Sequence, residues 1–285
     1  ENVKDNIIRI FIIYSSISVI ILTLLNISGL RLFNSLNMTM SLTSGGGFLP
    51  SDSIKNIIET NFQKLVFIFS LLVSMLNFYL LFNIFNKKTL LKEHREDLYL
   101  LILTIILFAL IYFNNYNGLD IIASVISSIA NSGLTLVNTD NNLSLYFLLL
   151  TIIGGSLISN TSGIKLTRFY ILLKITSSEI IKLISPNSVT NRTIFSSEHK
   201  ITDENIKISF LIFISFFISL FILSSLLVID DIGFDRSFKI SILTLTNTVN
   251  SEIYNLENLN FSNLLTSSKI SLIMFMIIGK IELIS

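Results

Sequence analysis

Long apolar segments alternate along this chain with short amphipathic stretches and polar turns. A helix needs about 20 predominantly apolar residues to cross the hydrocarbon core of a bilayer. Runs of this kind predict membrane-spanning helices at 7–27, 62–86, 98–114, 144–175, 207–229 and 265–285.

Shorter helices are expected between the long ones. Their patterns place them at Phe33–Thr43, Ile121–Ala130 and Phe238–Thr246, and each leads into a polar kink. Pro50-Ser51-Asp52 opens a further short surface helix that reaches about residue 60. The order of long span, short helix, kink and long span therefore occurs three times, which indicates an internal repeat.

A fixed spacing supports the repeat. Phe33 to Gly47 and Leu119 to Gly133 are both steps of 14 residues. Phe234 to Thr248 is also a step of 14, but no glycine stands there. The spacing predicts repeat units at 1–97, 98–206 and 207–285.

The composition of the chain, together with this pattern, predicts its fold class. The chain of 285 residues is 51% hydrophobic and only 14% charged, whereas a soluble domain carries about 25% charged residues. We expect an all-α integral membrane protein with repeated helix–pore-helix–filter–helix units, embedded in the lipid bilayer. The net charge of +1 offers no basic field for nucleic acid. Cysteine is absent, and no catalytic motif appears, so an enzyme is not expected.

The first kink, Thr43-Ser44-Gly45-Gly46-Gly47-Phe48, indicates an ion filter. Consecutive glycines are unfavourable inside a helix but suit a backbone that presents its own carbonyls. At membrane depth, irregular backbone is tolerated where it is buried in protein or lines a water-filled path. A re-entrant packing loop is the alternative for a single kink, and three kinks in register favour the filter. The candidate filter residues are Thr43, Ser44, Gly45, Gly46, Gly47, Asn131, Ser132, Gly133, Asn247, Thr248 and Val249.

The span at 144–175 is interrupted in its middle by glycine and serine, so we expect a discontinuous helix. The interruption is interpreted as a movable gating loop below the filter, with close helix packing through small residues as the alternative. Lys165 and Arg168 either take part in gating or mark the cytoplasmic end of the break. The candidate gating residues are Gly154, Gly155, Ser156, Asn160, Thr161, Ser162, Gly163 and Lys165.

Charged residues elsewhere in the chain carry three further expectations. Lys280 lies within the last span, and an intramembrane charge is a functional hypothesis by default. Glu93, Glu96 and Asp97 are interpreted as a solvated face. Basic residues gather at 87–97 and 165–200, whereas the loop at 230–235 is acidic, so the basic segments are expected in the cytoplasm and the kinks outside.

These residues resemble the TrkH/KtrB superfamily of potassium-transport membrane subunits, and its TrkH branch more closely. Thr43–Phe48 and Ser127–Gly133 are similar to filter segments of that family. Ile153–Ser156 and Asn160–Lys165, with Arg168, resemble its inner-helix signature. Weaker similarity lies at Ser185–Val189 and at Ile278–Leu283, where Lys280 replaces an arginine.

The resemblance implies four linked repeats around one pore, with a filter glycine from each repeat and a gating loop in the third inner helix. It also implies a homodimer in a bacterial cytoplasmic (inner) membrane and a cytoplasmic nucleotide-binding regulatory partner of the TrkA kind. K⁺ would be the transported ion, with no resident cofactor. The chain starts at Glu1 and ends inside an apolar run, and it is interpreted as a fragment without the family's first repeat.

One departure from the family leaves the transported ion open. The last kink has Thr248 or Val249 where a filter glycine is expected, and a branched residue does not easily adopt glycine dihedrals. Potassium uptake is the first hypothesis. The alternatives are a Na⁺-permeable or non-selective cation channel, and a membrane interaction subunit that does not conduct.

Overall fold

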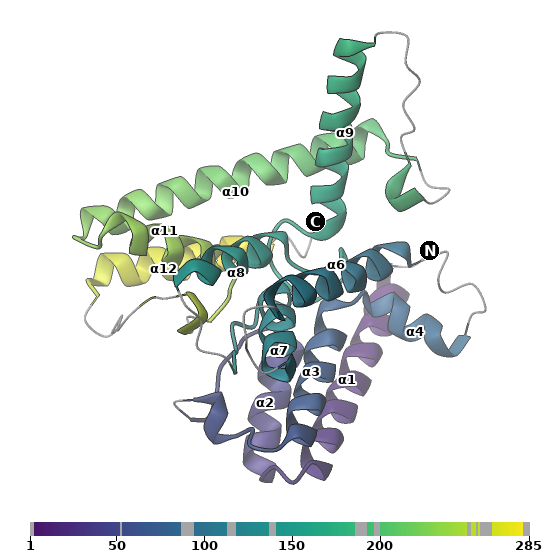
Figure 1. Cartoon of the computed structure of the whole chain (residues 1–285), viewed down its shortest axis with the longest axis vertical. Helices are drawn as coiled ribbons and strands as arrows, with labels where there is room; N and C mark the ends of the chain where they lie inside the picture. Colours follow the sequence, from purple (N-terminus) through teal and green to yellow (C-terminus); the bar gives the residue numbers. More distant parts are fainter. Residues whose placement is uncertain are drawn as a thin grey trace.

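The computed structural model is helical over the residues that it describes, and it forms an all-α fold (Figure 1). The described residues are 3–51, 53–86, 94–112, 118–136, 141–185, 193–196, 200–249, 252–254, 256 and 264–281. Residues 87–93 of the predicted basic loop at 87–97, the similarity at 186–189, Asn250, Ser251 and residues 282–285 lie outside this range. The helices are α1 (Val3–Ile27), α2 (Leu32–Ser44), α3 (Asn61–Met75), α4 (Phe78–Asn86), α6 (Arg95–Tyr112), α7 (Gly118–Ile129), α8 (Asn141–Ile153), α9 (Leu166–Ile184), α10 (Asp203–Ile229), α11 (Phe234–Leu245) and α12 (Thr266–Ile281).

Long outer helices flank shorter inner ones. α1 packs against α2 and α3, α6 packs against α7, and α10 packs against α11 and α12. Figure 1 shows α1, α2 and α3 running side by side at the bottom of the view, while α10, α11 and α12 run in a different direction at the upper left and α9 projects upward. The predicted short helices thus occur between the predicted long ones.

The outer helices have the surface of membrane helices. Two segments, Ile10–Ile27 and Asp203–Ile229, are long and apolar enough to cross a bilayer by length and composition among the described residues. Their exposed side chains include Phe11, 69% exposed, and Leu211, 67% exposed. Large apolar side chains exposed along a whole helix suit lipid rather than water.

Helix boundaries follow local capping chemistry. Thr60 begins α3 with a capping box, in which its side chain accepts from the amide of Gln63 and the Gln63 side chain accepts from the amide of Thr60. Thr202 caps α10 in a similar way, by accepting from the amide of Asn205. Gly45 ends α2 in the left-handed region with φ of 66°.

The span expected at 62–86 is not one continuous helix, so this prediction is wrong in detail. α3 ends at Met75, and α4 begins at Phe78. Leu76 is extended, and the side chain of Asn77 accepts a hydrogen bond from the amide of Tyr79. Backbone groups freed by the break bond to distant segments instead.

Two smaller expectations also need correction. The surface helix expected between Pro50 and residue 60 is a single 3₁₀ turn, Ile54–Asn56. The segment expected to be a polar connection from about residue 176 continues as helix α9 to Ile184. α9 is amphipathic, which explains why its polar residues resembled a loop in the sequence.

A partly buried ion pair joins α3 to α7. Lys64 on α3 lies 2.6 Å from Asp120 in the first turn of α7, and their side chains are only 19% and 12% exposed. We expect Lys64→Met to lower the free energy of unfolding by about 1–3 kcal/mol, because it leaves a buried carboxylate without its partner. Thermal unfolding in detergent measures this change.

Lys182→Met provides the control for that prediction. Lys182 pairs with Glu179 on the surface of α9, where the side chains are 33% and 55% exposed. An exposed pair of this kind contributes about 0–1 kcal/mol. Equal destabilisation by the two substitutions would contradict a specific role for the Lys64–Asp120 pair.

Candidate ion pathway

α2, α7 and α11 end in the same turn. An amide just beyond each helix donates back to a carbonyl five residues earlier: Gly46 to Ser41 at 2.9 Å, Ser132 to Ser127 at 3.1 Å, and Thr248 to Leu243 at 2.9 Å. The residue before it lies in the left-handed region, with φ of 66° at Gly45, 57° at Asn131 and 51° at Asn247. This is the Schellman arrangement, repeated three times. We name these segments the α2 turn (Gly45–Gly47), the α7 turn (Asn131–Gly133) and the α11 turn (Asn247–Val249).

Aligning the turns by these hydrogen bonds identifies the residue that replaces glycine. The third position is Gly47 in the α2 turn, with φ of 67°, and Gly133 in the α7 turn, with φ of 70°. The same position in the α11 turn is Val249, which does not have a positive φ. The 14-residue spacing pointed to Thr248, and the structure shifts the equivalence by one residue.

The three turns pack against one another. A Cβ atom placed on Gly47 would lie 1.9 Å from the carbonyl oxygen of Ser132, and one placed on Gly133 would lie 2.3 Å from the carbonyl oxygen of Val249. The α2 turn therefore contacts the α7 turn, and the α7 turn contacts the α11 turn. Each turn follows the C-terminus of a helix, the negative end of the helix dipole. The arrangement brings backbone carbonyls and three negative helix ends together.

Pairs of side-chain hydroxyl groups connect the α7 and α11 turns to the helix residues that precede them. The hydroxyls of Ser127 and Ser132 lie 2.8 Å apart, and those of Thr246 and Thr248 lie 2.8 Å apart. These contacts fix turn residues against the helix that precedes them.

Tyr254 is a supporting residue that sequence reasoning missed. It lies in the 3₁₀ turn Glu252–Tyr254 after the α11 turn, it is fully buried, and its hydroxyl lies 3.5 Å from that of Ser128. Burial raises the pKa of the Tyr254 phenol well above its usual range, so the group stays protonated and able to donate. No motif or periodicity around Tyr254 signals this position.

The interruption between α8 and α9 is a compact loop, and the predicted discontinuity is confirmed as a structural feature. We name Gly154–Lys165 the break loop. Its turns use positive φ of 68° at Gly154 and 86° at Gly163. The hydroxyl of Thr161 accepts from the amide of Gly155 at 3.0 Å, and the amide of Leu166 donates to the carbonyl of Gly155 at 3.1 Å. The break therefore has its own internal hydrogen bonding.

The buried side chain of Lys165 forms hydrogen bonds within the break loop. Its side chain is 2% exposed, and its ammonium group donates to the hydroxyl of Thr161 at 3.0 Å and to the carbonyl of Ser159 at 3.3 Å. The residue itself has φ of 73°. Lys165 is thus a structural part of the break rather than a solvated charge beside it. Arg168, which follows in the first turn of α9, is also buried.

The break loop is joined to the break between α3 and α4. The amide of Ser156 donates to the carbonyl of Met75 at 3.0 Å, and the amide of Phe78 donates to the carbonyl of Ile158 at 3.0 Å. A Cβ on Gly155 would lie 2.7 Å from the carbonyl oxygen of Met75, which explains why glycine stands there. These long-range bonds satisfy backbone groups that a continuous α3 would have used internally.

The carboxylates at the start of α6 hold both breaks, so the expectation of a solvated face is wrong for them. Glu96 accepts from the amide of Leu157 at 2.9 Å, and Asp97 accepts from the amide of Asn77 at 2.9 Å. Asp97 is 1% exposed. Glu93, the third member of that expected face, lies outside the described residues.

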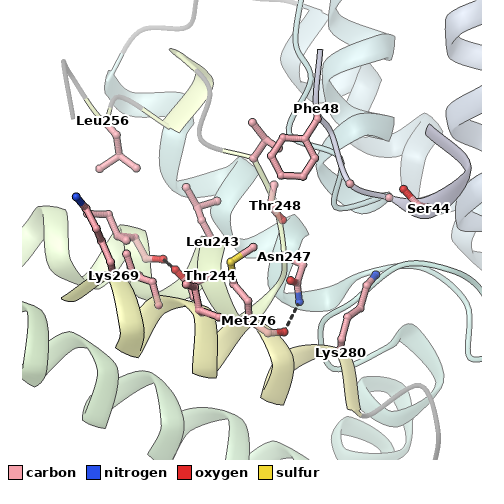
Figure 2. Close-up of a pocket in the computed structure, with 16 residues that line it drawn as sticks. Ser44, Phe48, Leu243, Thr244, Asn247, Thr248, Leu256, Lys269, Met276 and Lys280 are labelled. Atoms are coloured by element: carbon pink, nitrogen blue, oxygen red, sulfur yellow. Dashed lines mark hydrogen bonds between the residues drawn. The ribbon is translucent and has the colours of Figure 1, made fainter. Parts of the chain in front are cut away.

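A cavity of about 770 Å³ lies against the α2 and α11 turns (Figure 2). Figure 2 shows Ser44 and Phe48 on one side, with Asn247, Thr248 and Met276 on the other. Lys280 on α12 also lines this space, and its ammonium group donates to the carbonyl of Asn160 in the break loop at 3.0 Å. Candidate filter residues and the predicted intramembrane charge thus line one cavity, and Lys280 links that cavity to the break loop.

The fold is that of an all-α membrane protein. No family model matches the chain. Over 189 residues it is 32% identical to an uncharacterized cation transporter of Methanocaldococcus jannaschii, covering 64% of the chain and 38% of that protein. The crystal structure of the potassium transporter TrkH from Vibrio parahaemolyticus superimposes with a TM-score of 0.84 at 19% identity, covering 96% of the chain and 61% of the solved chain.

The expected all-α fold is confirmed by the solved structure, and both similarities support the resemblance to the TrkH/KtrB superfamily. Both similar proteins are named as transporters, which supports a transporter over an enzyme. The chain spans 38% of the length of the curated relative and 61% of the solved chain. The roles of the candidate filter and gating residues stay predictions.

Proposed function

We propose that this chain forms part of a pathway for K⁺ through the membrane, with backbone carbonyls of the three turns as its filter. The observation that carries this proposal is the threefold occurrence of one Schellman-ended helix, with the three turns in mutual contact. Backbone carbonyls can replace the water around a monovalent cation. The negative ends of α2, α7 and α11 favour a cation over an anion.

The ion would pass down its electrochemical gradient into a bacterial cell through the cytoplasmic (inner) membrane, which the protein crosses several times. The distribution of basic residues supports that orientation. By resemblance, the assembly would be a homodimer with a cytoplasmic nucleotide-binding regulatory partner of the TrkA kind.

The break loop is proposed as the gate. It lies beside the α2 turn, where a Cβ on Gly45 would be 3.5 Å from the carbonyl oxygen of Asn160. It also accepts the ammonium group of Lys280, which lines the same cavity as the filter candidates. A glycine-rich loop held by hydrogen bonds can rearrange without unfolding the helices on either side.

A Na⁺-permeable or non-selective channel is the second candidate function. It is favoured by one observation, the valine at the third position of the α11 turn. Without a positive φ there, the Val249 carbonyl does not repeat the geometry of Gly47 and Gly133. A filter in which one of the turns has a different backbone geometry would discriminate less between K⁺ and Na⁺.

Growth and flux measurements separate these candidates. Expression of the full-length protein should rescue potassium-limited growth of a strain without its own potassium uptake, and the purified protein should carry K⁺ into liposomes. Equal competition by Na⁺ would select the non-selective channel. Neither rescue nor flux of any cation would eliminate the transport proposal and leave the non-conducting interaction subunit.

Lys280→Gln tests whether the charge beside the filter opposes cations. We expect K⁺ flux to rise about fivefold, because removal of one positive charge near a hydrated path relieves ~1 kcal/mol of repulsion. Lys174→Gln serves as control, since Lys174 lies on α9 and donates to the carbonyl of Thr193 away from the cavity. An unchanged or lower flux in Lys280→Gln would place this charge outside the ion path.

A further inference from the structure

The three turns differ in how they are held. In the α7 turn, the side chain of Asn131 donates to the carbonyl of Thr151 on α8 at 2.8 Å. In the α11 turn, the side chain of Asn247 donates to the carbonyl of Met276 on α12 at 3.0 Å. Each of these turns is therefore tied to the long helix that follows it. The equivalent residue in the α2 turn is Gly45, which has no side chain to form such a bond.

The tie to the end of α2 comes from the break loop instead. The side-chain amide of Asn160 donates to the carbonyl oxygen of Thr43. Thr43 lies in the last turn of α2, where carbonyls have no helical partner. The amides of Gly45 and Gly46 bond to Leu42 and Ser41, which leaves the Thr43 carbonyl to Asn160.

Asn160 is itself held on its other side. The backbone carbonyl of Asn160 accepts a hydrogen bond from the ammonium group of Lys280 at 3.0 Å. A chain of contacts therefore runs from α12 through the break loop to the end of α2. The hydroxyl of Thr43 does not take part, since it donates back to the carbonyl of Thr39 at 2.8 Å.

We propose that Asn160 couples the gate to the filter through its side-chain hydrogen bond to Thr43, which holds the end of α2 directly before the α2 turn. This inference rests on the proposed function, because it assigns a regulatory role to the same filter and loop. When the break loop moves, the α2 turn loses its tie, while Asn131 and Asn247 keep theirs to α8 and α12. The Thr43 carbonyl is then released from an amide donor and becomes free to contact a cation. Opening and ion selectivity should consequently change together.

Planar-bilayer recording of the full-length protein tests the coupling, because it reports open probability and the K⁺/Na⁺ permeability ratio separately. Asn160→Ala removes the donor, and Asn160→Asp replaces it with an acceptor of nearly the same shape. We expect both variants to raise the open probability and to lower the permeability ratio, each by about fivefold, the effect of one hydrogen bond. Asn131→Ala should lower the permeability ratio and leave the open probability at the wild-type value.

Asn37→Ala is the matched control. Asn37 also donates its side-chain amide to a backbone carbonyl, that of Phe33 at 2.8 Å, but on the exposed face of α2. It should change neither quantity. A change of open probability alone in both Asn160 variants would overturn the inference, but it would still support the break loop as the gate. No change in either quantity would overturn it as well.

A second readout distinguishes failure of this inference from failure of the proposed function. Preferential K⁺ binding to a folded filter raises the melting temperature in K⁺ over that in Na⁺. The expected result is a K⁺-specific stabilisation of the wild type that falls in Asn160→Ala. If the wild type shows stabilisation and conduction but Asn160→Ala matches it, the coupling alone is wrong. If the wild type shows neither, the proposed function fails and the coupling fails with it.

Discussion

Gly47→Val is expected to abolish ion flux, the largest effect of any single substitution proposed for this chain. A Cβ at Gly47 would lie 1.9 Å from the carbonyl oxygen of Ser132 and 2.7 Å from Cγ2 of Val249. The backbone there also has φ of 67°, which a β-branched residue rarely adopts. The α2 turn would have to separate from the α7 turn. Liposome flux of K⁺ measures the loss.

Gly233→Val is the control for that substitution. Gly233 precedes α11, and a Cβ there would have no atom within 4 Å. Its flux should remain close to that of the wild type, while both variants should fold, as judged by size-exclusion chromatography and melting. Wild-type flux in Gly47→Val would mean that the filter has been assigned to the wrong residues.

Val249→Gly is expected to raise the K⁺/Na⁺ permeability ratio, on the order of tenfold, or ~1.4 kcal/mol of discrimination. Glycine at this position could take the positive φ that Gly47 and Gly133 show, and would complete the equivalence of the three turns. Ion-competition flux measures the ratio. Val228→Gly, at an exposed position near the end of α10, is the control. An unchanged ratio in Val249→Gly would show that Val249 does not limit selectivity.

The sequence predicted the features that depend on local chemistry. Gly45–Gly47 ends α2 because glycine can adopt the left-handed turn, and Gly154–Gly163 interrupts an apolar run because glycine and serine disfavour a continuous helix there. Hydrophobic periodicity located the short helices to within a few residues. These signals lie within one segment of the chain and do not require knowledge of its neighbours.

The features that sequence reasoning missed depend on contacts between distant segments. The helix break at Leu76 is stabilised by Ser156 and Asp97, which lie far from it in the chain. The burial of Asp97 reflects its bond to Asn77, which no charge pattern reveals. The proposed role of Asn160 depends on its hydrogen bond to the carbonyl of Thr43, 117 residues away.

The sequence left Thr248 or Val249 as the counterpart of Gly133, and the spacing of 14 residues favoured Thr248. Counting 14 residues from the start of each short helix assumes that the helices have equal lengths before the turn. The hydrogen bonds of the turn itself give the register instead, with Thr248 equivalent to Ser132 and Gly46. Asn131 and Asn247 offered a usable signal, because asparagine tolerates the left-handed region better than most residues.

The central claim is that the three turns bind a monovalent cation through their carbonyls. Crystals of the full-length protein grown in Rb⁺, a K⁺ substitute with a strong anomalous signal, test it most directly. The account predicts anomalous peaks between the α2, α7 and α11 turns, within coordination distance of carbonyl oxygens at Gly47 and Gly133. Well-ordered turns without a peak between them, or Rb⁺ bound only elsewhere, would contradict it.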